Sequence, residues 1–473
     1  DVLGSRGLGD VYKRQIESGG TMRVNCNISA IIANNQLSKS EDALSSAIER
    51  LSSGLRINKA EDDASGMAIS KKMHAQIKAI ERSANNTQDG VSVVQTAEGA
   101  LSELENILQR MRELSVKAAS ETNSGEEKDA IQVEIDQLTK EVDRISTSTE
   151  YNTMTLLDGT LQRRAYADKD NVSATISDTV TAGEYSIEVT KEATRPSVDL
   201  DLPANAPSAG YISINGVKVD IEAGESISSI ESKIQEACER SNATMSKDNG
   251  TMTISGKMYG KNEQLKITFS SAEIAGMFGQ TDTNIMVNGT DCEAALKKGF
   301  SSTATLTTEG ANITVKDIGS FEMDIEIPGD TKYAECVIKA TDIGIMRIQA
   351  GANEGQQLSI GIPEVSMHTL GLDNLNLRTE DCAKDAMTRL DDAISKVSSI
   401  RSKLGAYQNR LETATGNLNE YNENITAALS RIEDCDMAAE MTEFTAQNVK
   451  TQAATSILAQ ANQRPETILQ LLQ

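Results

Sequence analysis

The sequence is poor in the residues from which aromatic cores are usually built. It contains no tryptophan, five phenylalanines and nine tyrosines among 473 residues. A chain with so few aromatic side chains can hardly rely on a single aromatic-rich core, so long aliphatic and alanine seams suit it better. The length itself is enough for roughly two to four domains.

Residues that commonly carry catalysis are also scarce. The two histidines, His74 and His368, lie far apart, and neither belongs to an HExxH motif or stands near a CxxC pair. The six cysteines are scattered, which fits reduced thiols or isolated core residues and argues against a zinc site. With no glycine-rich phosphate loop and no GxSxG motif either, we expect no enzyme activity, no metal and no cofactor.

One acidic cluster, Glu61, Asp62 and Asp63, is the nearest approach to a cation site. It lacks the spaced oxygen ligands and the central glycine of a calcium loop. We therefore interpret it as a solvated turn or a helix cap.

Long apolar runs are missing, since none approaches the ~20 residues that cross a bilayer. No basic start followed by an apolar core is visible near the N-terminus, so a cleaved signal peptide is not expected. The net charge of −24 disfavours nucleic acid and anionic membranes as partners. Residues 1–21 lack periodicity and do not begin with Met, which predicts a non-native or disordered leader.

Proline is absent from two long stretches. The six prolines lie at positions 196, 203, 207, 328, 363 and 465, so residues 22–195 and 364–464 contain none. Because proline breaks helix interiors, this distribution predicts two long helical arms around a different middle region.

The longest helical pattern runs from Leu390 to Ile432. Apolar or aromatic residues recur there at alternating intervals of three and four, which keeps one stripe of a helix facing a partner. They are Leu390, Ala393, Val397, Ile400, Leu404, Tyr407, Leu411, Ala414, Leu418, Tyr421, Ile425, Ala428 and Ile432. At ~1.5 Å per residue such a helix is roughly 65 Å long and requires partners of similar length.

Two other segments repeat this spacing and are the natural partners. They comprise Val94, Ala97, Leu101, Leu104, Leu108, Met111, Ser115 and Ala118, then Ile131, Ile135, Leu138, Val142 and Ile145. Ser124 and Glu127 have the spacing of a capping box ahead of the latter segment. Ser38 and Glu41 have the same spacing and predict a helix start, with a polar connection following over residues 56–70.

In the middle region the period changes from helical to alternating. Strands are predicted at 185–190, 211–224, 251–256, 264–269, 311–319, 321–329 and 357–362, with one helix at 226–240. Four of the five phenylalanines fall in this region, which gives it a conventional core. The fold class is therefore mainly α, with a β-rich insertion.

Apolar faces remain at both chain ends, outside the bundle seams. If these faces pair, they leave further apolar surface that other copies of the chain could cover. The residues predicted to carry assembly are Ile28, Ile32, Leu44, Ile48, Leu51, Met437, Met441, Phe444, Ile457, Leu458 and Leu469. Pro465 predicts a kink or a restart of the last helix, and such end helices should be marginal alone in water.

Both ends of the chain resemble bacterial flagellin. The matching segments are AIERLSSGLRINKAEDDASGMAIS (47–70), LQRMRELSVKAASETN (108–123), EYNTMTLLDG (150–159), LGAYQNRLE (404–412) and RIEDCDMAAEMTEF through SILAQANQRPETILQLL (431–472). The middle resembles the family only loosely, through SINGVKVDIEAGESISSIESKIQEA (213–237), which is similar to a repeat found in flagellin insertions. Cys26 and Cys435 depart from the small residues usual in the terminal segments, and we interpret them as buried small hydrophobes rather than redox cross-links.

The resemblance implies a structural filament subunit that gives motility. In such a subunit both termini run side by side as an antiparallel coiled-coil hairpin and form an inner tube, while the three seamed helices form an outer tube. It also implies extracellular location, unfolded export through the flagellar apparatus, and an export chaperone and filament cap as partners. The terminal segments would order only on polymerisation.

The resemblance further implies binding to Toll-like receptor 5, at positions matching Arg110, Leu114 and Glu134. Ordinary roles in the surface and packing of the bundle are the alternative for these three residues. Two other functions stay open: a hook-filament junction protein with similar ends, and a surface adhesin acting through the β-rich insertion.

These patterns, together with what the resemblance implies, predict six segments. They are a leader at 1–21, an N-terminal inner-tube helix at 22–60, bundle halves at 61–160 and 346–430, a variable β-rich surface domain at 161–345, and a C-terminal inner-tube helix at 431–473.

Overall fold

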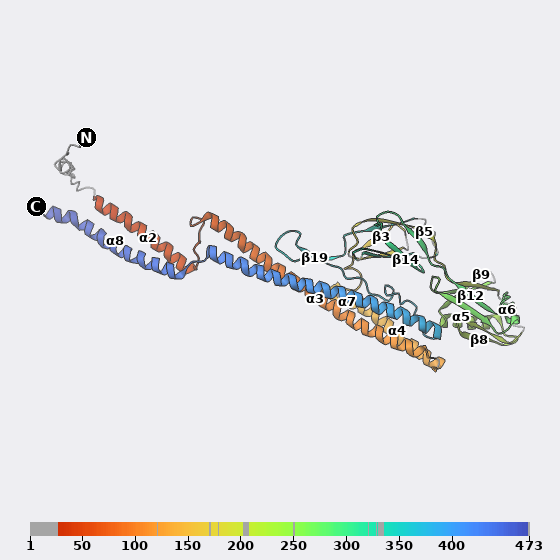
Figure 1. Ribbon diagram of the computed structural model, residues 1–473. Helices are drawn as coiled ribbons and strands as arrows, with labels where there is room; N and C mark the ends of the chain where they lie inside the picture. Colours follow the sequence, from red (N-terminus) through yellow and green to blue (C-terminus); the bar gives the residue numbers. More distant parts are fainter. Residues whose placement is uncertain are drawn as a thin grey trace, which may run out of the picture. The chain divides into compact units, whose positions relative to one another are not determined.

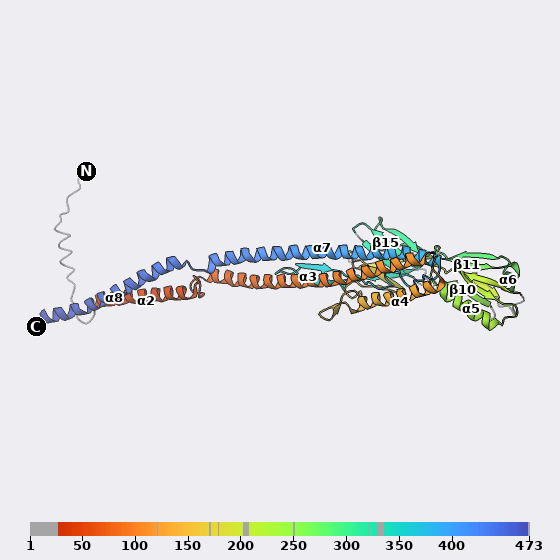
Figure 2. The same ribbon diagram turned by 90° about the horizontal axis from the view of Figure 1, so that it is seen from below.

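The computed structural model describes residues 27–471 except 121, 170–171, 178, 202–207, 249–250, 320, 328 and 330–334. Long helices occupy both ends of the described chain, and strands occupy the sequence between them (Figures 1 and 2). The predicted fold class, mainly α with a β-rich insertion, is confirmed. The leader predicted at 1–21 lies outside the described residues, as does Cys26.

The described chain divides into two compact units. One contains the residues up to Glu81 and from Asn419 onward, and the other is Arg82–Leu418. The division falls inside two long helices, α3 (Ala64–Ala118) and α7 (Glu380–Glu433), so each helix contributes to both units. The six segments derived from the sequence stay a prediction.

In the larger unit, the three predicted seams meet in one core. Parts of α3 and α7 pack there with α4 (Gly125–Ser148). The buried seam residues include Leu101, Leu104, Leu108 and Met111 on α3, Ile131, Ile135, Val142 and Ile145 on α4, and Leu390, Val397, Leu404 and Leu411 on α7. The partners predicted for the Leu390 to Ile432 seam are therefore confirmed within this unit.

Polar contacts fix the register of α3 against α7. Arg401 donates through Nε to Glu98 Oε1 at 3.1 Å, and it also pairs with Glu105 further along α3. Deeper in the interface, the hydroxyl of Thr415 lies 3.0 Å from that of Thr87. A guanidinium that binds two carboxylates on one helix resists sliding of that helix past its partner.

The helix starts differ in how well the sequence predicted them. At α4 the Ser124 hydroxyl accepts from the Glu127 N–H at 3.3 Å, while Ser124 N–H donates to Glu127 at 2.7 Å, which keeps the pKa of Glu127 below its usual value. This predicted capping box is confirmed.

The second predicted helix start, at Ser38, is wrong. Helix α2 (Ile28–Ser53) already begins at Ile28, where Asn27 accepts from the Ala30 N–H at 3.1 Å. Ser38 therefore lies in the helix interior, where the backbone N–H groups have helical partners and need no cap.

The predicted polar connection over 56–70 is too long. Helix α3 begins at Ala64, because Asp63 Oδ1 accepts from the N–H groups of Ser65 at 3.0 Å and Gly66 at 2.9 Å. These bonds hold the pKa of Asp63 below its usual value. The acidic cluster thus includes a helix cap, as the sequence indicated.

The β-rich region consists of small sheets in which every described strand pair is antiparallel. Three sheets have four strands, in the orders β13-β5-β17-β3, β14-β15-β16-β4 and β12-β11-β7-β8, and one has the order β6-β10-β9. Their bounds are β3 (Ala165–Ala167), β4 (Ser173–Ile176), β5 (Gly183–Lys191), β6 (Ser197–Asp201), β7 (Gly210–Ile214), β8 (Val217–Ile221), β9 (Ala243–Asp248), β10 (Thr251–Gly256), β11 (Gln264–Phe269), β12 (Asn284–Asn288), β13 (Glu293–Leu296), β14 (Thr305–Glu309), β15 (Asn312–Asp317), β16 (Phe321–Glu326) and β17 (Cys336–Ala340).

Two further strand pairs flank this region in the sequence. They are β1 (Glu150–Tyr151) with β2 (Met154–Thr155), and β18 (Met346–Gln349) with β19 (Gln357–Ile360). The β18–β19 hairpin packs on the bundle, since a Cβ atom on Gly90 of α3 would lie 2.2 Å from Ile348. Glycine at position 90 therefore lets the hairpin approach the helix closely.

Two separate cores hold the β-rich region together. One includes Tyr185, whose ring lies 5.1 Å from that of Phe300 and 5.9 Å from that of Phe321. The other is covered by α5 (Ile227–Arg240) and α6 (Ala272–Met277) and contains Phe269 and Phe278, with ring centroids 5.9 Å apart. The predicted concentration of phenylalanine in the core of this region is confirmed.

Replacing Leu411 with Asp is expected to unfold the bundle, because Leu411 is 1% exposed in its core. Even Leu→Ala at such a site costs about 2–5 kcal/mol, and an unpaired buried carboxylate adds a further penalty. Thermal unfolding followed by circular dichroism measures the effect. The matched control is Asn409→Asp, an exposed position on the same turn. Equal melting temperatures for the two variants would contradict the assignment of this core.

Candidate functional site

The surface of the terminal helices is the main candidate for function. Helix α2 lies beside α8 (Met437–Leu471) in the smaller unit. The buried positions of the two helices are small: Ala33, Ser40 and Ala47 on α2 and Ala454 and Ala461 on α8. The helices therefore approach each other through small side chains and have little apolar volume between them.

The large apolar side chains of these helices lie mostly on the outside. Ile28 and Ile32 are each 64% exposed and Ile457 is 56% exposed. The exposed set also contains Ile31, Ile48, Met437, Met441 and Val449. Of the other predicted assembly residues, Leu44, Leu51, Phe444 and Leu458 are partly buried, whereas the side chain of Leu469 lies outside the described part.

Few polar contacts fasten α2 to α8. The side-chain amide of Asn27 donates to the carbonyl of Ala461 at 2.8 Å, and Arg50 lies 3.8 Å from Glu440. On the outer side of α8, a shallow apolar groove is lined by Met441, Thr442, Thr445, Ala446, Val449 and Lys450.

Helix α8 continues to Leu471, so the predicted restart at Pro465 is wrong.

The links between consecutive helices pair with each other at one end of this helix pair. Gly54 has a φ of +74° and ends α2, and its carbonyl accepts from the Cys435 N–H at 2.9 Å. Leu55 forms a β-bridge with Asp434. Arg56 donates to the Glu433 carbonyl from its backbone N–H and to the Ile432 carbonyl from its guanidinium, both at 2.6 Å.

A buried carboxylate secures this joint. Glu433 is 7% exposed, and its Oε2 accepts from the Ser70 hydroxyl at 2.8 Å and lies 2.8 Å from His74 Nε2. Sequence reasoning missed this cluster. The available signal was the i, i+4 spacing of Ser70 and His74, which places both on one face of a helix.

The three candidate receptor residues have two different environments. Arg110 on α3 donates from Nε and Nη2 to Glu134 Oε1 on α4 at 3.1 and 2.9 Å, so these two charged side chains form one exposed pair. Leu114 is 3% exposed and belongs to the bundle core. Only Arg110 and Glu134 therefore present their side chains at the surface.

The cysteines are free thiols in the described part of the chain. Cys238, Cys292 and Cys336 are buried, and burial raises the pKa of Cys238 to about 12. Cys435 is half-buried and its Sγ lies 3.7 Å from Glu440 Oε2. Raised thiol pKa values disfavour the reactive thiolate.

Neither a metal centre nor a membrane span is present among the described residues. No cluster of three or more His, Cys, Asp or Glu side chains in these ranges is arranged to hold a metal ion. Nor does any helix in the same ranges have the length and apolar character needed to span a membrane.

Known proteins are similar to this chain at both of its ends and over most of its length. The model of the bacterial flagellin N-terminal helical region matches residues 24–162, and that of the C-terminal helical region matches residues 387–472. Flagellin of Clostridium tyrobutyricum is 35% identical over 451 residues, covering 94% of this chain and 100% of that protein. Flagellin of Bacillus subtilis (strain 168) is 32% identical over 453 residues, covering 95% and 100%.

A solved structure of FliC from Burkholderia pseudomallei is 18% identical, covers 68% of this chain and 99% of that one, and has a TM-score of 0.24. That likeness is too weak to support an argument, whereas the sequence relatives extend over nearly the full chain. Flagellins are structural filament proteins rather than enzymes, in agreement with the sparse chemistry of the sequence. This chain belongs to the flagellin family.

Proposed function

We propose that this flagellin polymerises through the apolar side chains that α2 and α8 expose, each covered by other copies of the chain. One observation carries the proposal: small residues are buried between the two helices, while Ile28, Ile32 and Ile457 remain outside. This arrangement is the reverse of a helix pair that is stable by itself, in which the largest apolar residues face the partner.

Burial of these side chains would drive assembly. Covering a Val, Leu, Ile or Met side chain fully stabilises by about 1.5–3 kcal/mol, and each subunit exposes several of them. Two helices that present different residues offer unlike surfaces. Head-to-tail contacts between unlike surfaces build rings or open helical filaments rather than two-fold dimers.

The limited apolar contact between α2 and α8 also agrees with the proposal that these helices become ordered when the subunit polymerises. Few polar contacts hold α2 to α8 and the side chains buried between them are small, so under this proposal the pair gains most of its apolar cover from neighbours, as in coupled folding and binding. Family membership supports the remaining steps of this proposal. They are unfolded export by the flagellar apparatus without a cleaved signal peptide, an extracellular location, interaction with an export chaperone and the filament cap, and motility.

A charge placed on the exposed apolar face is expected to block polymerisation without unfolding the subunit. Met441→Glu and Ile457→Glu each change a side chain that is more than half exposed, so monomer stability should change little. Elongation of seeded filaments should fall at least tenfold, because the carboxylate must be desolvated at the contact. Light scattering after seeding measures the rate.

The control variant is Gln452→Glu, an exposed polar position on the same helix. It should elongate at the parental rate. Removing residues 437–473 should leave the larger unit folded but unable to polymerise. Filaments formed by that truncated chain would overturn the proposal.

We also propose that the exposed Arg110–Glu134 pair is part of a surface that binds Toll-like receptor 5. The pair joins two neighbouring helices and presents a fixed charge pattern, and Leu114 lies in the core beneath. A small epitope of this kind needs rigid support, which the bundle core supplies. Under this proposal Leu114 acts by packing and the two charged residues make the contact.

Arg110→Ala monomer is expected to activate the receptor about tenfold less than the parent, a loss of ~1.4 kcal/mol in binding. A receptor reporter assay with purified monomer measures it. Arg112→Ala is the matched control, since Arg112 lies two residues away and is 46% exposed in a pair with Asp391. Equal potency of the Arg110 variant and the parent would contradict receptor binding at this pair.

A further inference from the structure

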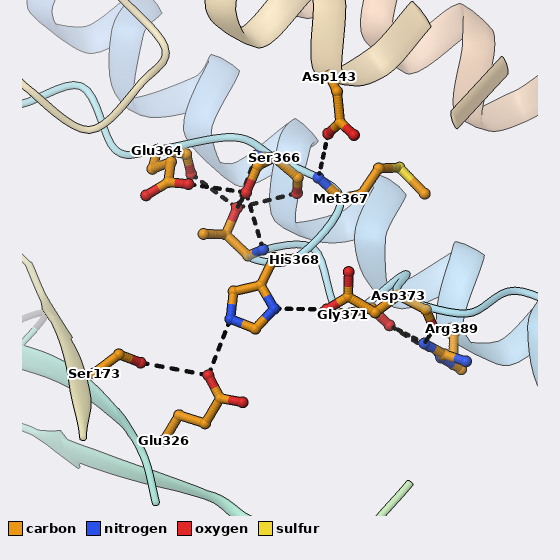
Figure 3. A network of polar contacts seen from close by, with 11 residues as sticks. Asp143, Ser173, Glu326, Glu364, Ser366, Met367, His368, Gly371, Asp373 and Arg389 are labelled. Atoms are coloured by element: carbon orange, nitrogen blue, oxygen red, sulfur yellow. Dashed lines mark hydrogen bonds and ion pairs between the residues drawn. The ribbon is translucent and has the colours of Figure 1, made fainter. Parts of the chain in front are cut away.

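The segment between β19 and α7, residues 361–379, is fastened to the helices of the larger unit. The Met367 N–H donates to Asp143 of α4 at 3.2 Å, and Arg389 of α7 donates to the carbonyls of Gly371 and Asp373 at 2.6 and 2.7 Å (Figure 3). The Leu377 N–H donates to Gln132 of α4 at 2.7 Å. We call this segment the anchored loop.

Two side chains of the anchored loop reach the β-rich region: Asn376 donates to the Arg240 carbonyl of α5 at 2.8 Å, and His368 contacts β16. His368 Nε2 lies 3.0 Å from Glu326 Oε2 at the end of β16, and His368 Nδ1 lies 2.6 Å from Asp373 on the anchored loop itself (Figure 3). Ser173 on β4 lies 3.4 Å from the same Glu326 oxygen. The imidazole therefore bridges the helix-bound loop and the sheet that contains β4 and β16.

The chemistry of this bridge depends on protons. A neutral imidazole has one N–H donor and one lone pair, and an ionised carboxylate only accepts. With a carboxylate oxygen at hydrogen-bond distance from each ring nitrogen, both contacts form only when both nitrogens carry protons. Loss of one proton leaves a nitrogen lone pair facing a carboxylate.

The charged groups around His368 come from the loop, the sheet and two helices. They are Glu364 and Asp373 on the anchored loop, Glu326 on β16, Asp143 on α4 and Arg389 on α7 (Figure 3). The cation Arg389 donates to the backbone carbonyls of Gly371 and Asp373. The two groups that act on the imidazole are both carboxylates, Asp373 and Glu326.

We propose that His368 is a proton-dependent clasp that fastens the β14-β15-β16-β4 sheet to the anchored loop and opens when the imidazole loses a proton. This device is independent of polymerisation and should operate in the monomer. It makes the attachment of this sheet to the helices of the same unit sensitive to the pH of the medium.

The direction in which the pKa of His368 is shifted agrees with this proposal. Hydrogen bonding to Asp373 and the charge of Glu326 raise the pKa of His368 above its ordinary value, which is about 6.5. A group whose pKa is higher in the folded than in the unfolded protein stabilises the folded state. This stabilisation is complete at pH values below the pKa of the unfolded protein, and it is lost as the pH rises through the pKa of the folded protein. The clasp is therefore closed in mildly acidic medium and opens toward alkaline pH.

Other contacts limit the consequence of opening. Gln162 donates to the Ile176 carbonyl of β4 at 2.8 Å and accepts from the Glu364 N–H at 3.2 Å, which is a second, uncharged link between sheet and loop. The clasp is also partly in solvent, with His368 59% and Glu326 41% exposed, so salt screens it. Opening should therefore loosen the sheet and leave it attached.

Two measurements on the full-length monomer test the proposal between pH 5.5 and 9.5. The first is a titration by NMR of the histidine Cε1–H signals, which is practical because the chain has only two histidines. His74→Gln leaves the His368 signal alone and serves as the control background. We expect His368 to titrate above about 6.5, and Glu326→Gln to move its midpoint to lower pH.

The second measurement is hydrogen exchange by mass spectrometry, corrected for the intrinsic pH dependence of exchange. Protection of residues 321–326 and 364–373 should fall several-fold from pH 6 to pH 9 in the parent and in His74→Gln. His368→Gln, which cannot ionise, should show low protection at both pH values.

Some results would overturn the clasp. A His368 midpoint at or below the value of an unfolded peptide would do so, as would a midpoint unmoved by Glu326→Gln. The same change in protection in His368→Gln as in the parent would show that another group controls the attachment. The milder Glu326→Gln variant and the titration of the parent keep the test valid if His368→Gln fails to fold.

Discussion

The size of the side chains between paired helices is the constraint on which the rest of this structure depends. In the larger unit, α3, α4 and α7 enclose Leu, Ile, Val and Met residues, which fill the interior of the bundle. Between α2 and α8 the buried residues are Ala and Ser, so the helices approach closely but bury little. The same helical period thus supports a bundle with a large apolar core in one unit and, in the other, a pair with small buried residues and exposed apolar side chains.

This contrast explains why polar contacts matter most at the joints. The bundle has apolar packing to define its register, and Arg401 adds specificity to it. The links at Gly54–Arg56 and Glu433–Cys435 have little apolar cover, so backbone bonds and the buried Glu433 fix them. Both histidines contact carboxylates: His74 contacts Glu433 at these links, and His368 joins the 361–379 segment to Glu326 of β16.

Much of the helical part was predictable, because an apolar period of three and four over many turns arises almost only where a long helix packs on a partner. The limits of that reasoning are visible at single residues. Tyr421 is a seam position by spacing, yet it is 48% exposed, whereas Leu418 and Ile425, the seam positions on either side of it, are buried. Ser38 and Glu41 matched a capping box by chance, because a four-residue pattern carries little information within a helix.

The predicted strands correspond to strands in the structure, but β1, β2, β3, β4, β6, β9, β12, β13, β14, β17 and β18 were missed. Several are short edge strands, such as β3 and β14, and tertiary pairing rather than local pattern defines these. The contacts of His368 with Glu326 and of His74 with Glu433 join residues 42 and 359 positions apart. No spacing rule connects residues at such separations.

Methionine oxidation most directly tests the central claim, that other copies of the chain cover the face of α8. Met437 and Met441 are 47% and 51% exposed on α8, and Met286 is 53% exposed on β12 in the β-rich region. The three should oxidise at similar rates in the monomer. In filaments, the account predicts that Met437 and Met441 become strongly protected while Met286 stays reactive. Unchanged oxidation of Met437 and Met441 in filaments would contradict it.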